Sequence, residues 1–306
     1  LPDTVRVCPS AEELYAHAEE FDAVLVVTPH KTHPALVMQA FAHGKHVLCD
    51  KPSANALAPA LEMNRAAEKS GLVFAMMFHQ RRYKKYMRLK KLLNDGALGE
   101  IMRVQLENSR YFRTWMYHRS GSWRSSWAGE GGGALLNQGQ HILDIWQWLF
   151  GMPTSIYAVI PYGKYNDFMV DDEATLLMEY PQQRTATFIL STGEGSYTER
   201  LEIVGTRGTA LLEDLGNLVA NELYSPGGAG KRTAEAVLAG LERLAAGCDD
   251  LIVVSNEVFS GGADYAGDTG RYLKALAQVN NALAARADHV VRVVCGIPVY
   301  YKGVEK

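Results

Sequence analysis

Short apolar runs alternate with helical patterns along residues 1–78, and this alternation constrains the fold more than any other feature of the chain. The run at 23–27 reads AVLVV, and the helical pattern HPALVMQAFAHG separates it from the next run, HVLCD. Continuous apolar runs are typical of strands buried on both faces, and helices between successive strands imply parallel pairing. We therefore predict a parallel α/β unit at 1–78, in which 23–27 is buried on both faces.

The pattern changes from Glu100 onward. The strand-like segment EIMRVQLENSRYF leads into an aromatic loop and a helix, and then SIYAVIPY, EATLLMEY, RTATFILST and RLEIVG follow with only short polar turns between them. Successive strands without intervening helices favour antiparallel pairing. Residues 79–214 are therefore predicted to form an α+β domain with a mainly antiparallel sheet.

After Asp214 the alternation of helices and strands returns. The segments TAEAVLAGLERLAAG and RYLKALAQVNNALAARA have helical patterns, and DLIVVSN and HVVRVVCG read as buried strands. Residues 215–306 are predicted to form a second, truncated parallel α/β segment. The predicted fold class is thus α/β and α+β in three successive parts.

Composition excludes several kinds of partner. With a net charge of -3, the chain gives no electrostatic reason to expect nucleic acid or an anionic membrane surface. No apolar run reaches the roughly 18 residues of a membrane span, and the N-terminus lacks the pattern of a signal peptide. The four cysteines form no C-x-x-C pair, which indicates reduced thiols, no metal site and a cytoplasmic protein. We expect a small-molecule substrate.

Polar residues follow two predicted strands of the first unit. Thr28, Pro29 and His30 come after the run at 23–27, and Asp50-Lys51-Pro52 comes after HVLC. In an open parallel sheet the carboxyl ends of the strands are where ligands bind. A partly desolvated lysine there can have a lowered pKa and take part in proton transfer. The alternative is a surface lysine beside a turn proline.

A second group of polar residues lies in GEGGGALLNQGQHILDIWQWLFG, which is predicted to be a helix that starts at Gly131–Gly133. Glycines at a helix start would let a ligand approach bare backbone N–H groups. Asn137, His141 and Asp144 have the spacing of one helical face, and these side chains suit substrate binding and general base chemistry. The alternative is a core histidine bonded to Asp144.

Together these motifs resemble the Gfo/Idh/MocA family of nicotinamide-dependent oxidoreductases. The matching residues are T-P-x-x-x-H after a strand, D-K-P, the helix G-G-G-x-L-x-N-x-G-x-H-x-x-D, and the later hairpin ERLEIVGTRGTALLED. The resemblance covers residues 1 to about 214. It implies a Rossmann-like first unit and an oxidoreductase that uses NAD or NADP on a sugar, cyclic polyol or related alcohol. It is also compatible with a homo-oligomer formed through the antiparallel sheet.

The resemblance implies specific roles for site residues. Lys51 would contact the reacting hydroxyl and the nicotinamide ribose, His141 would exchange the hydroxyl proton, and Asn137 would hydrogen-bond the substrate. Trp123 and Arg124 would also contact substrate, although their aromatic loop could instead serve packing or a subunit interface. The full set of implied cofactor-binding residues is Thr28, Pro29, His30, His33, Asp50, Lys51 and Pro52, and that of substrate-binding residues is Trp123, Arg124, Asn137 and Asp144.

A phosphate-binding G-x-G-x-x-G segment should open a dinucleotide-binding unit. The one formal match, 129–134, follows a loop instead of a strand, so we reject it as a dinucleotide site. The first unit is therefore read as truncated, and we expect this chain to bind a dinucleotide weakly.

From Leu211 to Gly303 the sequence resembles a different family, the bifunctional adenosylcobinamide kinase and cobinamide-phosphate guanylyltransferases of cobalamin synthesis. The residues that carry this resemblance are LLEDLGNLVANE, DLIVVSNEVFSGG, LAQVNNALAARADHVVRVVCGIP and YYKG. It implies that Glu213 helps to hold the magnesium of GTP or ATP, with Asn256 and Glu257 near the nucleotide. We interpret the chain as a chimera joined at about 205–215. The alternatives are one oxidoreductase with an unusual extension, or a remnant that binds nothing.

Overall fold

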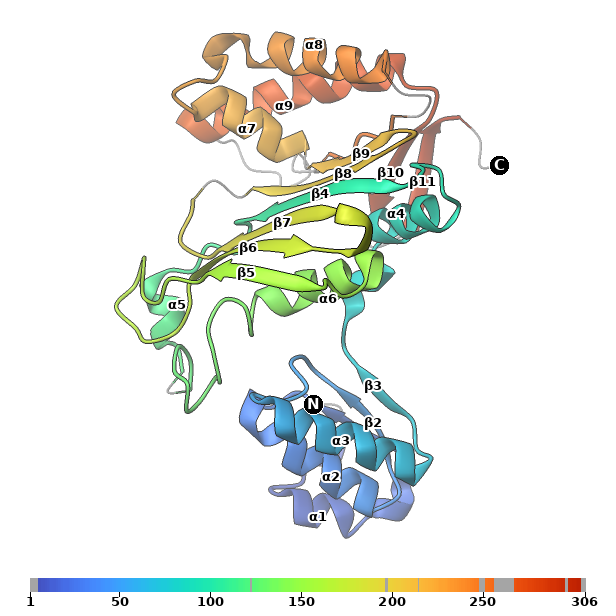
Figure 1. Ribbon diagram of the computed structural model, residues 1–306, viewed down its shortest axis with the longest axis vertical. Coiled ribbons are helices and arrows are strands. Elements are labelled where there is room, and N and C mark those ends of the chain that lie inside the picture. Colours follow the sequence, from blue (N-terminus) through green and yellow to red (C-terminus); the bar gives the residue numbers. More distant parts are fainter. Residues whose placement is uncertain are drawn as a thin grey trace.

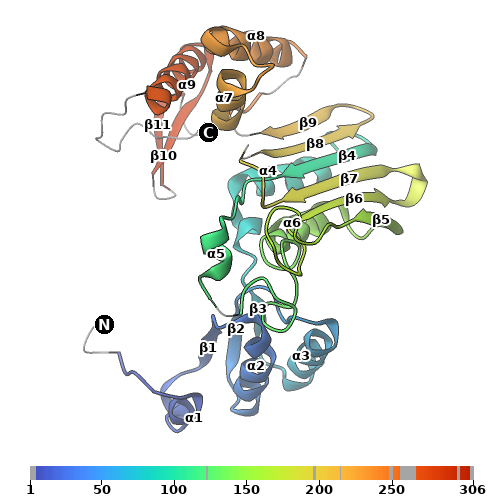
Figure 2. The same cartoon turned by 90° about the vertical axis from the view of Figure 1, so that its left-hand side faces the viewer.

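The computed structural model describes residues 5–121, 123–195, 198–213, 215–247, 251–255, 267–294 and 297–303. Buried apolar side chains within these ranges form three separate clusters along the chain, at 26–63, 86–203 and 215–279. Figures 1 and 2 place the C-terminal helices beyond one edge of the large sheet and residues 5–78 at the opposite end of the molecule.

Residues 5–78 form a three-stranded parallel sheet in the order β1-β2-β3, which confirms the predicted parallel unit. Helix α2 packs against β1, β2 and α3. Gly44, with φ +68°, follows the end of α2 and allows the left-handed turn that leads into β2. The elements are α1 (Ala11–Tyr15), β1 (Ala23–Val26), α2 (His33–Ala42), β2 (His46–Cys49), α3 (Leu57–Ser70) and β3 (Phe74–Met76).

The prediction that 23–27 is buried on both faces is wrong. Val26 is 3% exposed, but Leu25 and Val27 are 55% and 64% exposed. Successive side chains of a strand point to opposite faces. In the described part of the chain, β1 therefore has one covered face and one face open to solvent.

Residues 101–213 contain a six-stranded sheet in the order β5-β6-β7-β4-β8-β9. Strand β4 pairs in parallel with β7, and the other pairs in this sheet are antiparallel, which confirms the predicted mainly antiparallel sheet. The elements of this region are α4 (Lys84–Asn94), β4 (Ile101–Asn108), α5 (Trp115–Arg119), α6 (Gly139–Phe150), β5 (Ser155–Val159), β6 (Glu173–Glu179), β7 (Thr185–Ser191), β8 (Glu199–Gly205) and β9 (Thr209–Glu213).

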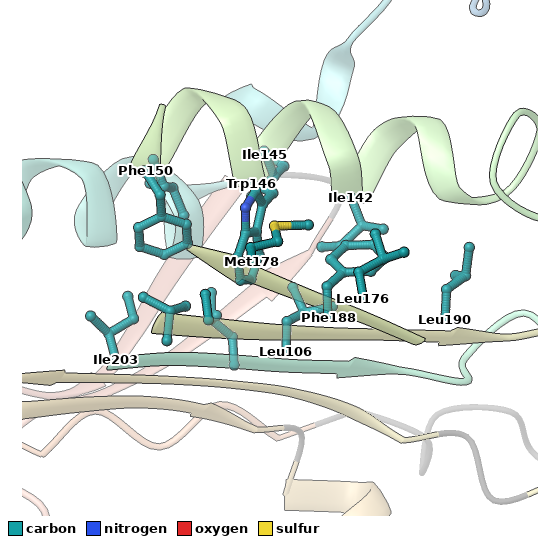
Figure 3. Close-up of a cluster of buried hydrophobic side chains, with 14 of the residues drawn as sticks. Leu106, Ile142, Ile145, Trp146, Phe150, Leu176, Met178, Phe188, Leu190 and Ile203 are labelled. Atoms are coloured by element: carbon teal, nitrogen blue, oxygen red, sulfur yellow. The ribbon is translucent and has the colours of Figure 1, made fainter. Parts of the chain in front are cut away.

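Helix α6 covers one face of this sheet (Figure 3). Its residues Ile142, Ile145 and Trp146 are at most 3% exposed, and they pack in one cluster with Phe188 and other sheet side chains. Residues three and four apart lie on one helical face, so this spacing turns an apolar stripe toward the sheet. Burial of each large apolar side chain contributes about 1.5–3 kcal/mol, and the packing fixes the helix that carries His141.

The edge strand β5 is exposed on both of its faces. Ile156 and Tyr157 of β5 are 54% and 70% exposed, and Leu177 of β6, which pairs with Tyr157, is 46% exposed. These side chains line a shallow hollow together with Ser155 and Glu179. This surface is a candidate for contact with another molecule.

The C-terminal region contains the helices α7 (Leu215–Tyr224), α8 (Thr233–Ala245) and α9 (Gly267–Arg286), followed by β10 (Val290–Val294) and β11 (Ile297–Lys302). The helical predictions for α8 and α9 are confirmed. The parallel pairing predicted here is wrong for the described residues, because β10 pairs antiparallel with β11. A hairpin partner that follows directly in sequence needs no crossover helix.

The predicted buried strand DLIVVSN is also absent from the residues that can be described. Residues 251–255 have no regular secondary structure, and Ile252 is 69% exposed. One backbone hydrogen bond of 3.3 Å joins Leu215 N–H to Val254 O. Among the helices that the structure describes, none combines the length and the apolar character needed to span a bilayer.

Candidate active site

Lys51 and Asn137 meet where the first unit contacts the loop before α6. The Lys51 amine donates to the Asn137 backbone oxygen and to Asn137 Oδ1, each at 2.8 Å. Lys51 lies two residues after β2. Asn137 lies in a turn, and its backbone N–H donates to Gly133 O. The structure therefore joins the two sequence motifs at one point.

Glu130 completes this network, and the sequence analysis did not identify it. Asn137 Nδ2 donates to Glu130 Oε1, while Ser125 N–H donates to Glu130 Oε2 at 2.7 Å. Glu130 and Asn137 are 4% and 7% exposed. Burial raises the pKa of Glu130 and lowers the pKa of Lys51. The Asn137 amide thus bridges a buried carboxylate and a partly desolvated amine.

His141 lies in the first turn of α6, four residues after Asn137. Its ring packs edge-on against His79 at 4.7 Å and against Phe78 at 6.3 Å between centroids. Burial, the Lys51 charge and His79 lower the pKa of His141 to about 4. His141 Nδ1 is buried and has no hydrogen-bond partner within the described part of the chain. At neutral pH the ring is therefore uncharged and can accept a proton.

Asp144 does not bond His141. Its carboxylate accepts from Arg81 Nε at 2.7 Å and from Arg81 Nη2 at 2.5 Å, and its side chain is 7% exposed. This bidentate pair ties α6 to the segment after β3. The carboxylate predicted to contact substrate is engaged by the protein in this structure.

Gly131–Gly133 do not form a ligand cradle, and the helix starts later than predicted, at Gly139. Asp171 accepts from Gly133 N–H at 2.8 Å and from Leu135 N–H at 2.7 Å, and its backbone oxygen accepts from Ala134 N–H. A side chain at Gly131 would collide with Asn55. A carboxylate and a packed loop of the protein therefore occupy the positions that were predicted for a ligand.

The cofactor-binding candidates divide into two groups. Thr28 and Pro29 are exposed at the carboxyl end of β1, and Asp50 is partly exposed after β2. His33 is fully buried, with Nδ1 2.8 Å from Pro52 O and Nε2 2.7 Å from Thr28 O. The first group is open to a ligand, while His33 holds the two loops together.

His30 also faces protein groups. Its Nδ1 lies 3.1 Å from Glu130 O, and its ring packs edge-on against Trp123 with 5.0 Å between centroids. Burial lowers the pKa of His30 to about 4. The contact joins the β1 loop to the loop that precedes α6.

The aromatic and basic loop converges on Tyr117, which the sequence analysis did not single out. The Tyr117 hydroxyl accepts from Arg124 Nη1 at 2.7 Å, from Gln138 Nε2 at 3.3 Å and from Asn137 Nδ2 at 3.4 Å. The loop of Trp123 and Arg124 therefore borders the contact between Lys51 and Asn137.

The resemblance of the C-terminal part assigned Glu213, Asn256 and Glu257 to a second nucleotide site. In β9 the backbone of Glu213 pairs with that of Arg200 of β8. Asn256 and Glu257 lie outside the described residues. The assignment of Glu213, Asn256 and Glu257 to a nucleotide site therefore stays a prediction.

The residues present fit a nicotinamide cofactor at this edge. The strand ends present exposed Thr28 and Pro29, and the Lys51 amine and the unpartnered His141 nitrogen lie nearby. Such a row of a lysine, an amide and a neutral imidazole suits an alcohol that gives up a proton as it loses hydride. The carboxylates whose charges raise the pKa of the Lys51 amine are Asp50 and Glu130.

Comparison with known families agrees with this geometry. Residues 3–78 match the oxidoreductase family with an NAD-binding Rossmann fold, and 86–211 match the GFO/IDH/MocA C-terminal domain. Residues 170–301 match the cobinamide kinase / cobinamide phosphate guanyltransferase family, so the two C-terminal matches overlap at 170–211. The second match begins earlier than the predicted resemblance at Leu211.

Individual relatives are similar over the same part of the chain. Trans-1,2-dihydrobenzene-1,2-diol dehydrogenase from Bos taurus is 29% identical over 69% of this chain and 60% of its own length. The scyllo-inositol 2-dehydrogenase (NADP(+)) IolW from Bacillus subtilis is 32% identical over 54% of this chain and 46% of its own length. The chain thus spans about half to three fifths of these relatives.

A solved structure has a similar fold over the same part of the chain. The WlbA dehydrogenase from Chromobactrium violaceum, in complex with NADH and UDP-GlcNAcA, superposes with a TM-score of 0.63 at 25% identity, over 67% of this chain and 59% of that one. Family matches at 3–78 and 86–211, the related dehydrogenases and this shared fold lead to one conclusion. In its region 3–211, the chain belongs to the GFO/IDH/MocA family of NAD-binding oxidoreductases.

Proposed function

We propose that the chain oxidises or reduces a sugar, a cyclic polyol or a related alcohol with NAD or NADP. The observation that carries this proposal is the contact of Lys51 with Asn137 between two separate units, close enough to His141 for the Lys51 charge to lower the pKa of that ring. The Lys51 amine is 2.8 Å from Asn137 Oδ1, and the buried His141 nitrogen has no partner in the described region.

Each of these groups would have a distinct task. The Lys51 ammonium donates a hydrogen bond to the substrate hydroxyl, and the Asn137 amide fixes the direction of that ammonium. Neutral His141 accepts the hydroxyl proton in oxidation and returns it in reduction. A bound nicotinamide supplies the hydride acceptor or donor.

The cofactor would lie along the carboxyl ends of β1 and β2. Thr28, Pro29, Asp50, Lys51 and Pro52 are the residues proposed to border it. His30 and His33 contribute indirectly, because their ring nitrogens face protein carbonyl groups.

The substrate would also contact the loop before α6. Arg124 reaches Asn137 through the Tyr117 hydroxyl, and its guanidinium lies over the Trp123 ring, so Trp123 and Arg124 are proposed as substrate contacts. We assign Asp144 a positioning role instead, because Arg81 engages both of its carboxylate oxygens.

Three further proposals concern the setting of the chain. The open β5 edge, with Ile156, Tyr157 and Leu177 exposed, would form a contact between copies of the chain. The cytoplasm is the proposed compartment. The three parts of the chain are proposed to divide near residues 78 and 214.

A second candidate function belongs to the C-terminal part. Its match to the cobinamide kinase / cobinamide phosphate guanyltransferase family supports a nucleotide-dependent transferase that binds GTP or ATP with magnesium. The overlap of two family matches at 170–211 supports a chimera. Calorimetric titration with GTP and magnesium would distinguish this activity from a segment that binds no nucleotide.

The main proposal is tested by following nicotinamide reduction with myo-inositol, glucose and related alcohols. His141→Ala should lower turnover by about 10²–10⁴-fold, the usual contribution of a general base. His17→Ala is the control, because His17 is a partly exposed histidine in the first unit, paired with Glu20. Alcohol-dependent reduction at equal rates in His141→Ala and the control would contradict the proposal.

A further inference from the structure

Two arginines of the aromatic loop stack on the same ring. Arg113 Cζ and Arg124 Cζ each lie 4.5 Å from the centroid of the Tyr117 ring. Within the described residues neither guanidinium forms an ion pair with a carboxylate. Two cations near one ring repel each other, and a ring quadrupole offsets only part of that repulsion.

Hydrogen-bond donors outnumber acceptors at this place. The Tyr117 hydroxyl oxygen accepts hydrogen bonds from Arg124, Gln138 and Asn137. A phenol oxygen has only two lone pairs, so these three donors compete for two acceptor positions. Arg113 Nε is buried and has no partner in the described part of the molecule. Buried donors without acceptors are costly, so the cluster is suited to a ligand that supplies several acceptor oxygens.

The nearby carboxylates that the structure describes form no ion pair with these arginines, although the charge of Arg124 lowers the pKa of Glu130 and so offsets part of its burial. Glu130 is committed to Asn137 Nδ2 and Ser125 N–H, and Asp172 accepts from the backbone N–H groups of Lys164 and Tyr165. The charges of Arg113 and Arg124 reach Lys51, where they add to burial in lowering the pKa of the amine. The cluster is therefore an electropositive extension of the alcohol site.

We propose that Arg113, Arg124 and Tyr117 form an anion subsite, so that the substrate is a sugar or polyol that carries a carboxylate or phosphate group. This inference rests on the proposed function, because the subsite adjoins Asn137 and Lys51. The anionic group binds the two guanidiniums and the Tyr117 hydroxyl, while the reacting alcohol faces Lys51 and His141.

Calorimetry with a matched set of ligands tests the proposal. Glucose is the neutral ligand, glucuronate and glucose 6-phosphate are the anionic ones, and inorganic phosphate reports binding of the anion alone. At least one anionic sugar should bind about tenfold more tightly than glucose, because charge-assisted hydrogen bonds form. Tighter binding of glucuronate would identify the anionic group of the substrate as a carboxylate, and tighter binding of glucose 6-phosphate would identify it as a phosphate. Added salt should reduce the advantage.

Variants connect that advantage to the two arginines. In Arg113→Gln and in Arg124→Gln, the anionic sugar should bind less than about threefold more tightly than glucose. Arg113→Lys keeps the positive charge, so it should retain part of the preference for the anionic sugar. Arg119→Gln is the control, because Arg119 stacks on Trp115 in the same loop at 3.7 Å and is exposed. It should keep the full ratio.

The outcomes separate this inference from the function on which it rests. Equal affinity for glucose and both anionic sugars, with a response of the His141 ring resonance to glucose, would overturn the anion subsite alone. A preference that survives both glutamine variants would overturn it as well. If no sugar binds and the His141 resonance never changes, both proposals are wrong.

Discussion

The region that contains the site and the C-terminal region differ in how their polar residues are used. In the first region, Lys51, Glu130 and Asn137 come from separate segments and meet in one buried network. In the described C-terminal region, α7, α8 and α9 pack through an apolar cluster that includes Val219, Val237 and Leu276. Buried polar groups need partners, so a network of them marks a place where side-chain identity is constrained by more than packing.

This difference explains why we read the function from the first region. Apolar helix packing is compatible with many functions, whereas a lysine, an amide and a neutral histidine at one sheet edge favour a narrow class of chemistry. The family match of the C-terminal region supplies a hypothesis for it, but the described residues supply no comparable site.

The largest effects should come from the two cores. Phe188→Ala removes a fully buried ring below α6 and should lower the free energy of unfolding by about 3–5 kcal/mol. Leu276→Ala, in the C-terminal cluster, should cost about 2–5 kcal/mol. Urea unfolding measures both changes.

The same two variants test whether the regions are independent. Phe188→Ala should weaken the response of the His141 ring resonance to alcohol, because the core below α6 positions that helix. Leu276→Ala should leave the response unchanged. Loss of the response in Leu276→Ala would show that the C-terminal cluster supports the site, and the proposed separation would then be wrong.

A smaller effect is expected at the pair that fixes α6. Arg81→Ala leaves the Asp144 carboxylate buried without its partner, so the free energy of unfolding should fall by about 1–3 kcal/mol. Arg103→Ala is the matched control, because Arg103 pairs with Glu202 on the open face of the sheet and should cost at most about 1 kcal/mol. Equal losses in the two variants would argue against a special role for the Arg81 pair.

The smallest change concerns Glu130. Glu130→Gln keeps the size of the side chain, but a glutamine can present either oxygen or N–H₂ to Asn137 and no longer fixes its amide. The pKa of Lys51 should fall further, since the Glu130 charge supports the ammonium. The pH dependence of the amine's reaction with trinitrobenzenesulfonate would reveal this shift. Glu202→Gln should leave it unchanged, and an unaltered profile in Glu130→Gln would contradict the network.

Part of the fold and of the site could be predicted from sequence periodicity. The strand and helix alternation predicted the parallel sheet. The resemblance assigned Lys51 and Asn137 to one site, and their side chains form a hydrogen bond in the structure. The D-K-P turn and the helix spacing are local patterns, and local patterns determine which strand end or helix face a residue occupies.

The missed residues depend on long-range packing. Nothing near Arg81 or Glu130 indicates that they would engage Asp144 and Asn137. The sequence favoured a ligand cradle at Gly131–Gly133 because the acceptor of the Gly133 N–H, Asp171, lies 38 residues further along the chain. The antiparallel pairing of β10 was missed for a related reason, since an apolar run does not specify the direction of its partner.

The central claim is that His141 is a neutral, buried base that faces an alcohol. Proton NMR of its ring, assigned by comparison with His141→Asn, tests this claim in the absence of any cofactor. The account predicts a titration midpoint near 4, well below the usual 6.5, and a saturable shift when myo-inositol or glucose is added at neutral pH. A titration midpoint near 6.5, together with a ring resonance that does not shift when either alcohol is added, would contradict the central claim.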